Sequence, residues 1–281
     1  MYKFLAIFVL MLACVLLCSF NQAINLNSWK CQLQNYSFSK LLEINNRILV
    51  LDQFKDYQKP FTKKELTKFQ QNGNLIFSYL SIGEAEGYRD YFNSMDKNLL
   101  ISENINWKDN FLVKFWSPKW QKIILGDQNT DGVLIKIINT GFDGVYLDLV
   151  DVFERFENKK EKAQQMSQFI QKISQKAKAQ NSDFKIIIQN GIEIINYLDK
   201  PQKLIDSIDG ISLEDVFFYG NSNSFNRRRH LMKLVERYQK YNKIVLSLEY
   251  IEQSHPQREK YLSFAQKYKL IPQTATKLLD K

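Results

Sequence analysis

The stretch GVYLDLVD, residues 144–151, decides the fold class, because it has the pattern of a short strand that is buried on both faces. Val145 and Leu147 lie on one face of such a strand. Tyr146 and Asp148 lie on the opposite face. Strands that are apolar at nearly every position are typical of parallel sheets, which helices cover on both sides. The stretch therefore predicts a parallel α/β fold with a carboxylate at the carboxyl end of one strand.

Seven further apolar runs flank this stretch, at residues 47–54, 75–83, 111–116, 184–190, 210–217, 243–250 and 270–275. Between them, apolar residues recur at steps of three and four, as on one face of a helix. The two clearest sets are Ala163, Met166, Ile170, Ile173 and Ala177, and then Leu231, Leu234, Val235 and Tyr238. Alternating strands and helices indicate a parallel sheet with right-handed crossovers.

Eight strands in about 250 residues predict a single (β/α)8 barrel, an α/β fold of the TIM-barrel type. The alternative is an open, doubly wound sheet. Such a sheet normally has a glycine-rich phosphate-binding turn after its first strand, whereas LDQFKDYQ, residues 51–58, contains no glycine. We therefore expect one barrel domain over residues 24–281.

The first residues have the pattern of a secretory signal peptide. A positive charge precedes an apolar run over residues 4–20, and a small residue, Ala23, closes the segment. We expect residues 1–23 to be removed, which would place the mature protein outside the cell, in a periplasm or at the cell surface. The alternatives are a lipid anchor on Cys14 or Cys18 and a retained membrane helix.

The composition argues against several classes of site. The chain has 281 residues with two histidines, three cysteines and no CxxC motif, so a zinc site with the usual ligands is not expected. A Ser-His-Asp or Cys-His site is left with His230 and His255 as candidate bases. The net charge is +9, or +8 without Lys3, but lysine and arginine are dispersed and form no basic stripe. We therefore expect no nucleic-acid partner and a chemistry based mainly on carboxylates.

Acidic residues gather at the carboxyl ends of the predicted strands: Asp52, Glu84, Glu86, Asp148, Asp151, Glu214, Asp215 and Glu249. In a barrel those ends meet at one mouth, where active sites are built. Asp148 has the parity opposite to the aliphatic face of its strand. Glu214 has the same relation to Ile211 and Leu213. Both carboxyls are therefore expected to point into the barrel, where burial is costly unless they are paired or functional.

Two carboxyls that face each other across a cleft are the minimal apparatus of glycoside hydrolysis. A separation of about 5 Å would make one of them a nucleophile, and about 6.5–9.5 Å would leave room for an attacking water. Aromatic and amide side chains near the strand ends are suited to sugar binding: Trp107, Trp116, Tyr250, Gln189 and Asn190. Two other interpretations remain open. The carboxyls cap helices or pair with Arg89, Lys114 or Arg155, or they bind Mg²⁺ in a phosphoesterase.

Five longer motifs follow one another along the chain: SYLSIGEAEGYRDYF (78–92), FWSPKW (115–120), TGFDGVYLDLVD (140–151), IIQNG (187–191) and DGISLEDVFF (209–218). Together they resemble glycoside hydrolase family 114, the endo-α-1,4-polygalactosaminidases and related proteins. The resemblance runs from about Trp29 to the last predicted strand. It implies a TIM-barrel hydrolase that cleaves α-1,4-linked galactosamine polymers and needs no metal or other cofactor.

The resemblance implies that Asp148 is the nucleophile and Glu214 the acid/base of a retaining mechanism. The substrate cleft is expected to contain Asp52, Tyr79, Glu84, Glu86, Tyr88, Arg89, Trp116, Tyr146, Asp151, Gln189, Asn190, Asp215 and Glu249. The expected partner is a galactosamine-containing polysaccharide, and we expect a monomer. Two alternatives remain open: a barrel that binds surface polysaccharide without cleaving it, and an acetylated or neutral substrate, since a protein of net charge +8 repels a polycation at long range.

Overall fold

The computed structural model describes residues 28–56, 59–218 and 225–280. The predicted signal peptide, residues 1–23, lies outside the described residues, and so do the lipid-anchor candidates Cys14 and Cys18. Within the described ranges, no helix combines the length and the apolar content that crossing a membrane requires.

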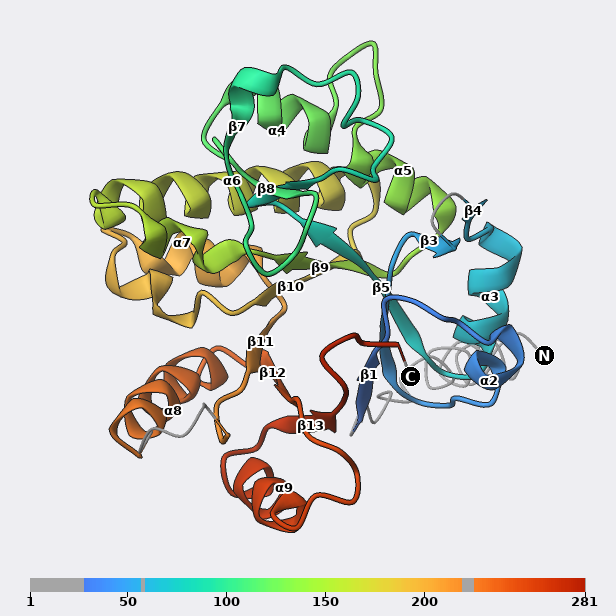
Figure 1. Cartoon of the computed structure of the whole chain (residues 1–281), viewed down its shortest axis with the longest axis vertical. Helices are drawn as coiled ribbons and strands as arrows, with labels where there is room; N and C mark the ends of the chain where they lie inside the picture. Colours follow the sequence, from blue (N-terminus) through green and yellow to red (C-terminus); the bar gives the residue numbers. More distant parts are fainter. Residues whose placement is uncertain (1–27, 57–58, 219–224, 281) are drawn as a thin grey trace, which may run out of the picture.

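The described residues form an eight-stranded parallel sheet that follows the order of the chain (Figure 1). Its strands are β1 (Trp29–Cys31), β2 (Ile48–Leu51), β5 (Leu75–Ser81), β9 (Gly144–Asp148), β10 (Lys185–Gln189), β11 (Gly210–Glu214), β12 (Ile244–Glu249) and β13 (Ile271–Thr274). Each strand pairs in parallel with its neighbours, and a helical connection leads from one to the next. This is the arrangement of a (β/α)8 barrel, so the predicted fold class is confirmed.

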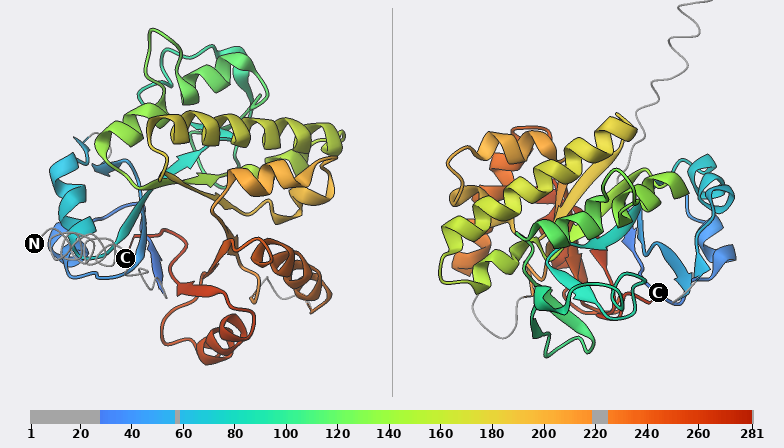
Figure 2. Two further views of the ribbon diagram at one scale, coloured as in Figure 1. Left: turned by 180° about the vertical axis from the view of Figure 1, so that it is seen from behind. Right: turned by 90° about the horizontal axis from the view of Figure 1, so that it is seen from above.

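Helices cover the outside of the barrel (Figure 2). They are α2 (Phe38–Leu42), α3 (Lys63–Gln71), α4 (Pro118–Leu125), α5 (Val133–Thr140), α6 (Lys159–Gln180), α7 (Pro201–Ser207), α8 (Phe225–Gln239) and α9 (Arg258–Lys267). Short 3₁₀ helices are η1 (Lys97–Leu99), η2 (Val150–Arg155) and η3 (Ile192–Asn196). The apolar faces predicted for residues 163–177 and 231–238 belong to α6 and α8, and both are buried as expected.

One predicted barrel strand lies elsewhere. The run 111–116 overlaps β8 (Asn110–Val113), which pairs antiparallel with β6 (Glu84–Glu86) and β7 (Leu100–Glu103) in a separate sheet between β5 and β9. The remaining barrel strand is β1. Its three residues are too few to show a period, and they closely follow the predicted signal peptide. A small antiparallel pair, β3 (Phe54–Asp56) and β4 (Lys59–Pro60), follows β2.

The barrel strands separate two apolar layers. Tyr146 of β9 joins inward side chains of β1, β2, β5, β10 and β12 in a cluster inside the barrel. Val145 of β9 and Leu213 of β11 join the larger cluster between the sheet and the helices. The parity predicted for these two strands is therefore confirmed. Asp148 and Glu214 occupy inward positions at the carboxyl ends of β9 and β11.

The barrel closes between β1 and β13 through a side chain. The Oε1 atom of Gln273, on β13, accepts a hydrogen bond from the N–H of Cys31 at 2.7 Å, and its Nε2 atom donates to the Cys31 carbonyl at 3.2 Å. Beyond this bridge, the N–H of Leu33 donates to the carbonyl of Leu279 at 2.8 Å. The C-terminal segment thus continues beside β1 (Figure 1), and one amide satisfies backbone groups at the seam.

Candidate active site

A cleft of about 770 Å³ opens at the carboxyl ends of the barrel strands. Asp148 ends β9, Glu214 ends β11, and Gln189 ends β10 between them. All three line the cleft. Since β9 and β11 flank β10, their backbones are about 10 Å apart, which is close enough for inward side chains to approach each other above it. The structure therefore brings the two predicted catalytic carboxyls to one hollow.

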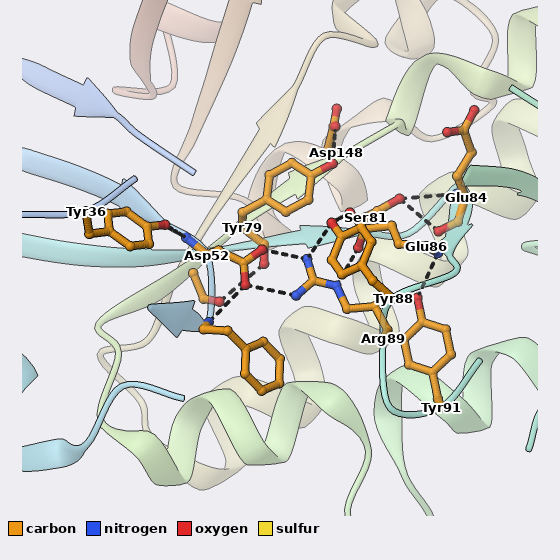
Figure 3. A network of polar contacts seen from close by, with 12 residues as sticks. Tyr36, Asp52, Tyr79, Ser81, Glu84, Glu86, Tyr88, Arg89, Tyr91 and Asp148 are labelled. Carbon is orange, nitrogen blue, oxygen red and sulfur yellow. Dashed lines mark hydrogen bonds and ion pairs between the residues drawn. The ribbon is translucent and has the colours of Figure 1, made fainter. Parts of the chain in front are cut away.

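Asp148 is held by two neutral donors. The Tyr79 hydroxyl, from β5, donates to its Oδ2 atom at 2.6 Å (Figure 3), and the N–H of Leu149 donates to Oδ1 at 2.6 Å. Leu149 has a φ of 60°, in the left-handed region that leucine rarely adopts. Burial, followed by the charge of Glu214, raises the pKa of Asp148 well above its usual value, and the two hydrogen bonds oppose this shift in part.

Glu214 is also held by neutral groups. The Tyr250 hydroxyl donates to its Oε1 atom, and the Asn190 amide donates to Oε2 at 3.1 Å. The Oδ1 atom of Asn190 accepts from the backbone N–H of Glu214 at 3.3 Å, so one amide holds both the side chain and the backbone. Burial, followed by the charge of Glu214, raises the pKa of Tyr250 far above its usual value, which keeps this hydroxyl a neutral donor.

The charge of Glu214 acts on Asp148. Two carboxyls that share a buried hollow resist being ionised together, and the nearby charge of Glu214 accordingly helps to raise the pKa of Asp148. Among the described residues, no lysine or arginine forms an ion pair with either one. A carboxylate beside a carboxylic acid is the starting state of acid-assisted glycoside cleavage.

A second polar network forms one wall of the cleft (Figure 3). The Arg89 guanidinium donates two hydrogen bonds to Asp52, at 2.9 and 2.7 Å, and its Nε atom donates to Glu86 at 2.7 Å. The Tyr88 hydroxyl also donates to Glu86, and its ring centre lies 4.8 Å from the guanidinium. Arg89 is only 5% exposed, so these are buried ion pairs that tie the end of β2 to β6.

Glu84 and Asp151 line another part of the cleft. Glu84 accepts two hydrogen bonds of 3.1 Å from the Asn104 amide and one of 3.1 Å from Arg155. Asp151 lies on η2, close enough to Glu214 and Glu84 to be affected by both charges. Burial raises its pKa first, Arg155 lowers it, and the two carboxylates raise it further. The predicted ion pairing with Arg89 and Arg155 is therefore confirmed for the wall carboxyls.

The cleft brings together most of the predicted site residues: Asp52, Tyr79, Glu84, Glu86, Tyr88, Tyr146, Asp148, Asp151, Gln189, Asn190 and Glu214. Four predicted residues lie elsewhere in the described part of the chain: Arg89, Trp116, Asp215 and Glu249. Arg89 lies behind Asp52 and Glu86, as described above. Trp116 packs edge-on against Phe115 and Phe156, and the Lys162 ammonium lies 3.3 Å from its ring centre.

Glu249 and Asp215 support the loop that follows β11. Glu249 is fully buried on the outward side of β12. Its carboxylate accepts hydrogen bonds from the N–H groups of Phe217, at 2.7 Å, and Phe218, at 3.1 Å. The Asp215 carboxyl accepts one of 3.5 Å from the N–H of Tyr250, which itself binds Glu214. Both residues therefore act on the backbone around the acid/base candidate.

Several cleft residues were not predicted as site residues, among them Tyr36, Asn104, Lys108, Arg155, Leu278 and Leu279, whereas Trp107 was named only as an aromatic suited to sugar binding. Asn104, Trp107 and Lys108 come from the loop between β7 and β8, in the inserted sheet. The Trp107 ring is 52% exposed, which leaves a face free to stack on a sugar. Its place at a strand end was the one available sign. Leu278 and Leu279 reach the cleft because the C-terminal segment lies beside β1.

The described His, Cys, Asp and Glu side chains form no group of three or more that could hold a metal ion. Asp52, Glu84, Glu86, Asp148 and Glu214 of the cleft are instead bound to hydroxyl, amide, guanidinium and backbone N–H groups.

Comparisons with other proteins agree with this architecture. The sequence model of the glycoside-hydrolase family GH114 matches residues 19–280. The uncharacterised protein MJ1477 of Methanocaldococcus jannaschii is 36% identical over 239 residues, which are 80% of this chain and 66% of that protein. The chain thus spans just under two thirds of that relative. An uncharacterised protein of Deinococcus radiodurans is 31% identical over 262 residues, 90% of this chain and 81% of that protein.

Two solved structures are similar in fold. Aspergillus fumigatus Ega3, in complex with galactosamine, superposes with a TM-score of 0.69 at 17% identity, over 90% of this chain and 92% of that chain. The glycoside hydrolase domain of PelA from Pseudomonas aeruginosa has a TM-score of 0.68 at 15% identity, over 90% of this chain and 96% of that chain. At these identities the likeness supports the barrel fold, independently of the strand pattern.

Proposed function

The chain belongs to the glycoside hydrolase family GH114, and on that basis we propose that it hydrolyses an α-1,4-linked, galactosamine-containing polysaccharide. The observation that carries this proposal is that Asp148 and Glu214 line one cleft, close enough for the charge of Glu214 to help raise the pKa of Asp148. The substrate class is supported by Ega3, which has a similar fold and was solved with galactosamine. The exposed Trp107 at the cleft is suited to sugar stacking.

In the first step, Asp148 is the nucleophile. One of its carboxylate oxygens forms a bond to C1 of the sugar while the bond from C1 to the bridging oxygen breaks. Glu214 gives its proton to that bridging oxygen, so the leaving chain departs as an alcohol. The donors around Asp148 favour this role, because the Tyr79 hydroxyl and the Leu149 N–H both stabilise the ionised form.

In the second step, Glu214 is the base. It takes a proton from a water whose oxygen attacks C1, and the bond between C1 and Asp148 breaks. The sugar leaves with its original anomeric configuration, and both carboxyls return to their starting state. Tyr250 and Asn190 keep the Glu214 carboxyl in place while its charge alternates.

The proposal is tested on galactosamine-containing polysaccharide, with and without EDTA, by mass spectrometry of the products. We expect EDTA-insensitive cleavage that falls about 10⁴-fold in both Asp148→Asn and Glu214→Gln. Asp183→Asn, at an exposed position in the turn before β10, is the matched control and is expected to leave the rate unchanged. Proton NMR of the first product is expected to show retained configuration.

Other outcomes would overturn the proposal in identifiable ways. Binding without cleavage by the wild-type protein would indicate a polysaccharide-binding barrel. EDTA-sensitive release of phosphate from phosphoesters would indicate a metal-dependent phosphoesterase. Product with inverted configuration would remove Asp148 from the role of nucleophile, because an inverting pair activates water instead.

We also propose that the protein is exported and acts as a monomer. Export is supported by the charged and apolar pattern of residues 1–23. N-terminal sequencing of the protein recovered from its native host is expected to begin at or near residue 24. A start at Cys14 or Cys18 with a bound lipid would replace cleavage by lipid anchoring.

A further inference from the structure

A second hollow, of about 530 Å³, lies between α7 and α8 on the outside of the barrel and shares no lining residue with the cleft. Its cationic residues come from two segments of the chain: Lys200, Lys203, Arg237 and Lys240. Ile205, which also lines it, is buried, whereas the Tyr241 side chain is 47% exposed. The hollow thus combines four positive charges with an apolar residue and an exposed aromatic ring.

Carboxylates of the protein do not neutralise these charges. Among the described residues, the ammonium groups of Lys200, Lys203 and Lys240 form no ion pair. The Arg237 guanidinium donates a hydrogen bond of 2.8 Å to the side-chain oxygen of Asn196, which is neutral. All four cations therefore keep donors for a ligand that carries negative charge.

The acidic residues nearest along the chain do not line the hollow: Asp199, Asp206 and Glu236. Asp199 is paired with Lys160 at 2.8 Å, and Asp206 accepts a hydrogen bond of 2.6 Å from the Gln202 amide. Cations that are gathered without a counter-charge repel one another, so an anion bound among them lowers the free energy of the assembly.

The hollow reaches the end of the barrel opposite to the cleft. Tyr241 follows the last turn of α8 and precedes β12, so it lies toward the amino ends of the strands. Lys178 and Lys185 lie at that end too, and they share one carboxylate, Asp209, at 3.5 and 3.7 Å. The first strand, β1, also begins at this end, so the segment that precedes it joins the barrel here. A surface that contacts the hollow would leave the cleft facing away from it.

We propose that the hollow binds the phosphate groups of anionic phospholipids and seats the barrel on a membrane surface, with the cleft directed away from the bilayer. Lysine and arginine near an anionic bilayer each add to its attraction. A tyrosine beside lysines is suited to the boundary between headgroups and acyl chains, because each of these side chains has an apolar body and a polar end.

A membrane is favoured over a soluble polyanion because the first residues have the pattern of a signal peptide, which brings the chain to a membrane. The inference goes beyond the proposed hydrolysis and does not depend on it, since the hollow and the cleft share no lining residue.

The test measures how the protein, as recovered from its host, partitions onto vesicles of phosphatidylcholine alone and onto vesicles with one third phosphatidylglycerol. We expect the partition coefficient to be about 100-fold higher on the anionic vesicles. The ratio of the two coefficients cancels any contribution of an N-terminal anchor. In Lys203→Glu/Lys240→Glu, which replaces two cations of the hollow by anions, we expect this ratio to fall to nearly one.

The matched control is Lys64→Glu/Lys260→Glu, which changes the net charge equally at exposed positions in the first turns of α3 and α9, toward the cleft end. We expect it to keep the ratio within about threefold of the wild-type value. Tyr241→Ala should weaken binding to anionic vesicles about fivefold, because the ring no longer leaves water, and should not change binding to soluble polyphosphate.

Three results would overturn the proposal. Equal partition of the wild-type protein onto both kinds of vesicle would remove the preference for anionic lipid. An equal fall of the ratio in the hollow variant and in the control would assign the attraction to net charge alone. Polyphosphate binding as tight as vesicle binding, with no effect of Tyr241→Ala on either, would indicate a site for a soluble polyanion. Thermal melting of each variant verifies that the fold is intact.

Discussion

The carboxyls of the cleft wall, Asp52 and Glu86, and those of the proposed catalytic pair, Asp148 and Glu214, differ in the groups that bind them. Asp52 and Glu86 are bound by the guanidinium of Arg89 at 2.7–2.9 Å. Asp148 and Glu214 are bound by hydroxyl, amide and backbone N–H groups. Both sets lie at the same mouth of the barrel, and both are largely buried.

The difference teaches how one cleft separates structural carboxyls from those proposed to react. A guanidinium keeps its proton at any ordinary pH, so the carboxyls that it binds have a permanent cationic partner and hold two segments together. Neutral donors orient a carboxyl but supply no full charge, so burial and a facing carboxylate still raise the pKa of Asp148. Asp52 and Glu86 therefore keep a fixed ionic partner, whereas Asp148 and Glu214 have none among the described residues and can exchange a proton with a substrate.

Removal of Arg89 is expected to have the largest effect on stability. Arg89→Met leaves Asp52 and Glu86 buried without a cation, so the free energy of unfolding should fall by about 3–5 kcal/mol in urea denaturation. Arg155→Met is the matched control. Its guanidinium is 49% exposed, and we expect a loss of about 1 kcal/mol or less. Equal losses in the two variants would contradict the distinction between the buried guanidinium of Arg89 and the half-exposed guanidinium of Arg155.

Glu249 tests whether backbone donors alone can keep a buried carboxyl ionised. Burial raises its pKa from 4.5 to about 7 despite hydrogen bonds from Phe217 and Phe218. Between these values the folded chain keeps a proton that the unfolded chain has lost, so stability falls as pH rises, by about 3 kcal/mol in total. In Glu249→Gln this part of the slope should vanish. Denaturation of the wild type and of Glu249→Gln at pH 4.5, 6 and 8 measures this pH dependence. An equal slope in the two proteins would refute the prediction.

The comparison also predicts that Asp148→Asn and Asp52→Asn change the free energy of unfolding in opposite directions. Asp148→Asn removes a charge that the fold disfavours at neutral pH, so it should stabilise the protein by roughly 0.5–2 kcal/mol while abolishing hydrolysis. Asp52→Asn removes a partner of Arg89 and should lower the free energy of unfolding of the protein. Thermal melting of both variants at pH 7 decides this. A loss of stability in Asp148→Asn would mean that its hydrogen bonds outweigh the cost of burying its charge.

The smallest expected effect is a shift in the pH profile. Tyr79→Phe removes a donor that lowers the pKa of Asp148, so this pKa should rise. The acidic limb of kcat/KM should then move to higher pH, with a loss of about tenfold at pH 5 and little change at pH 8. Tyr36→Phe is the control on the wall, since the Tyr36 hydroxyl accepts from the N–H of Asp52. A uniform loss at every pH in Tyr79→Phe would indicate a purely structural role.

The inward positions of Asp148 and Glu214 could be predicted from sequence because they follow from local alternation. In GVYLDLVD and GISLED, the aliphatic positions occupy one face, so Asp148 and Glu214 must occupy the other. The same rule places Glu249 opposite to Leu246 and Leu248, on the outward face of its strand. The position of Glu249 at the end of a strand was therefore insufficient evidence that it lies in the cleft. The alternation of inward and outward positions was the better guide.

Other features could not be predicted because they depend on contacts between distant segments. Asn104 reaches Glu84 only because β6, β7 and β8 fold into a separate antiparallel sheet. Pairing with Arg155 was among the expected ion pairs, but its partner, Glu84, lies 71 positions away and could not be named from sequence. The strand β1 has three residues and is recognisable only by its pairing with β2.

The seam at Gln273 also makes barrel closure depend on the order of synthesis. The two bonds from Gln273 to Cys31 span 242 positions, so β1 stays open on one side until Gln273 has left the ribosome. At typical rates this interval is roughly 12–50 s. An unpaired strand edge exposed for that time invites aggregation. Until Gln273 is made, the edge of β1 that faces away from β2 therefore lacks the side chain that closes it.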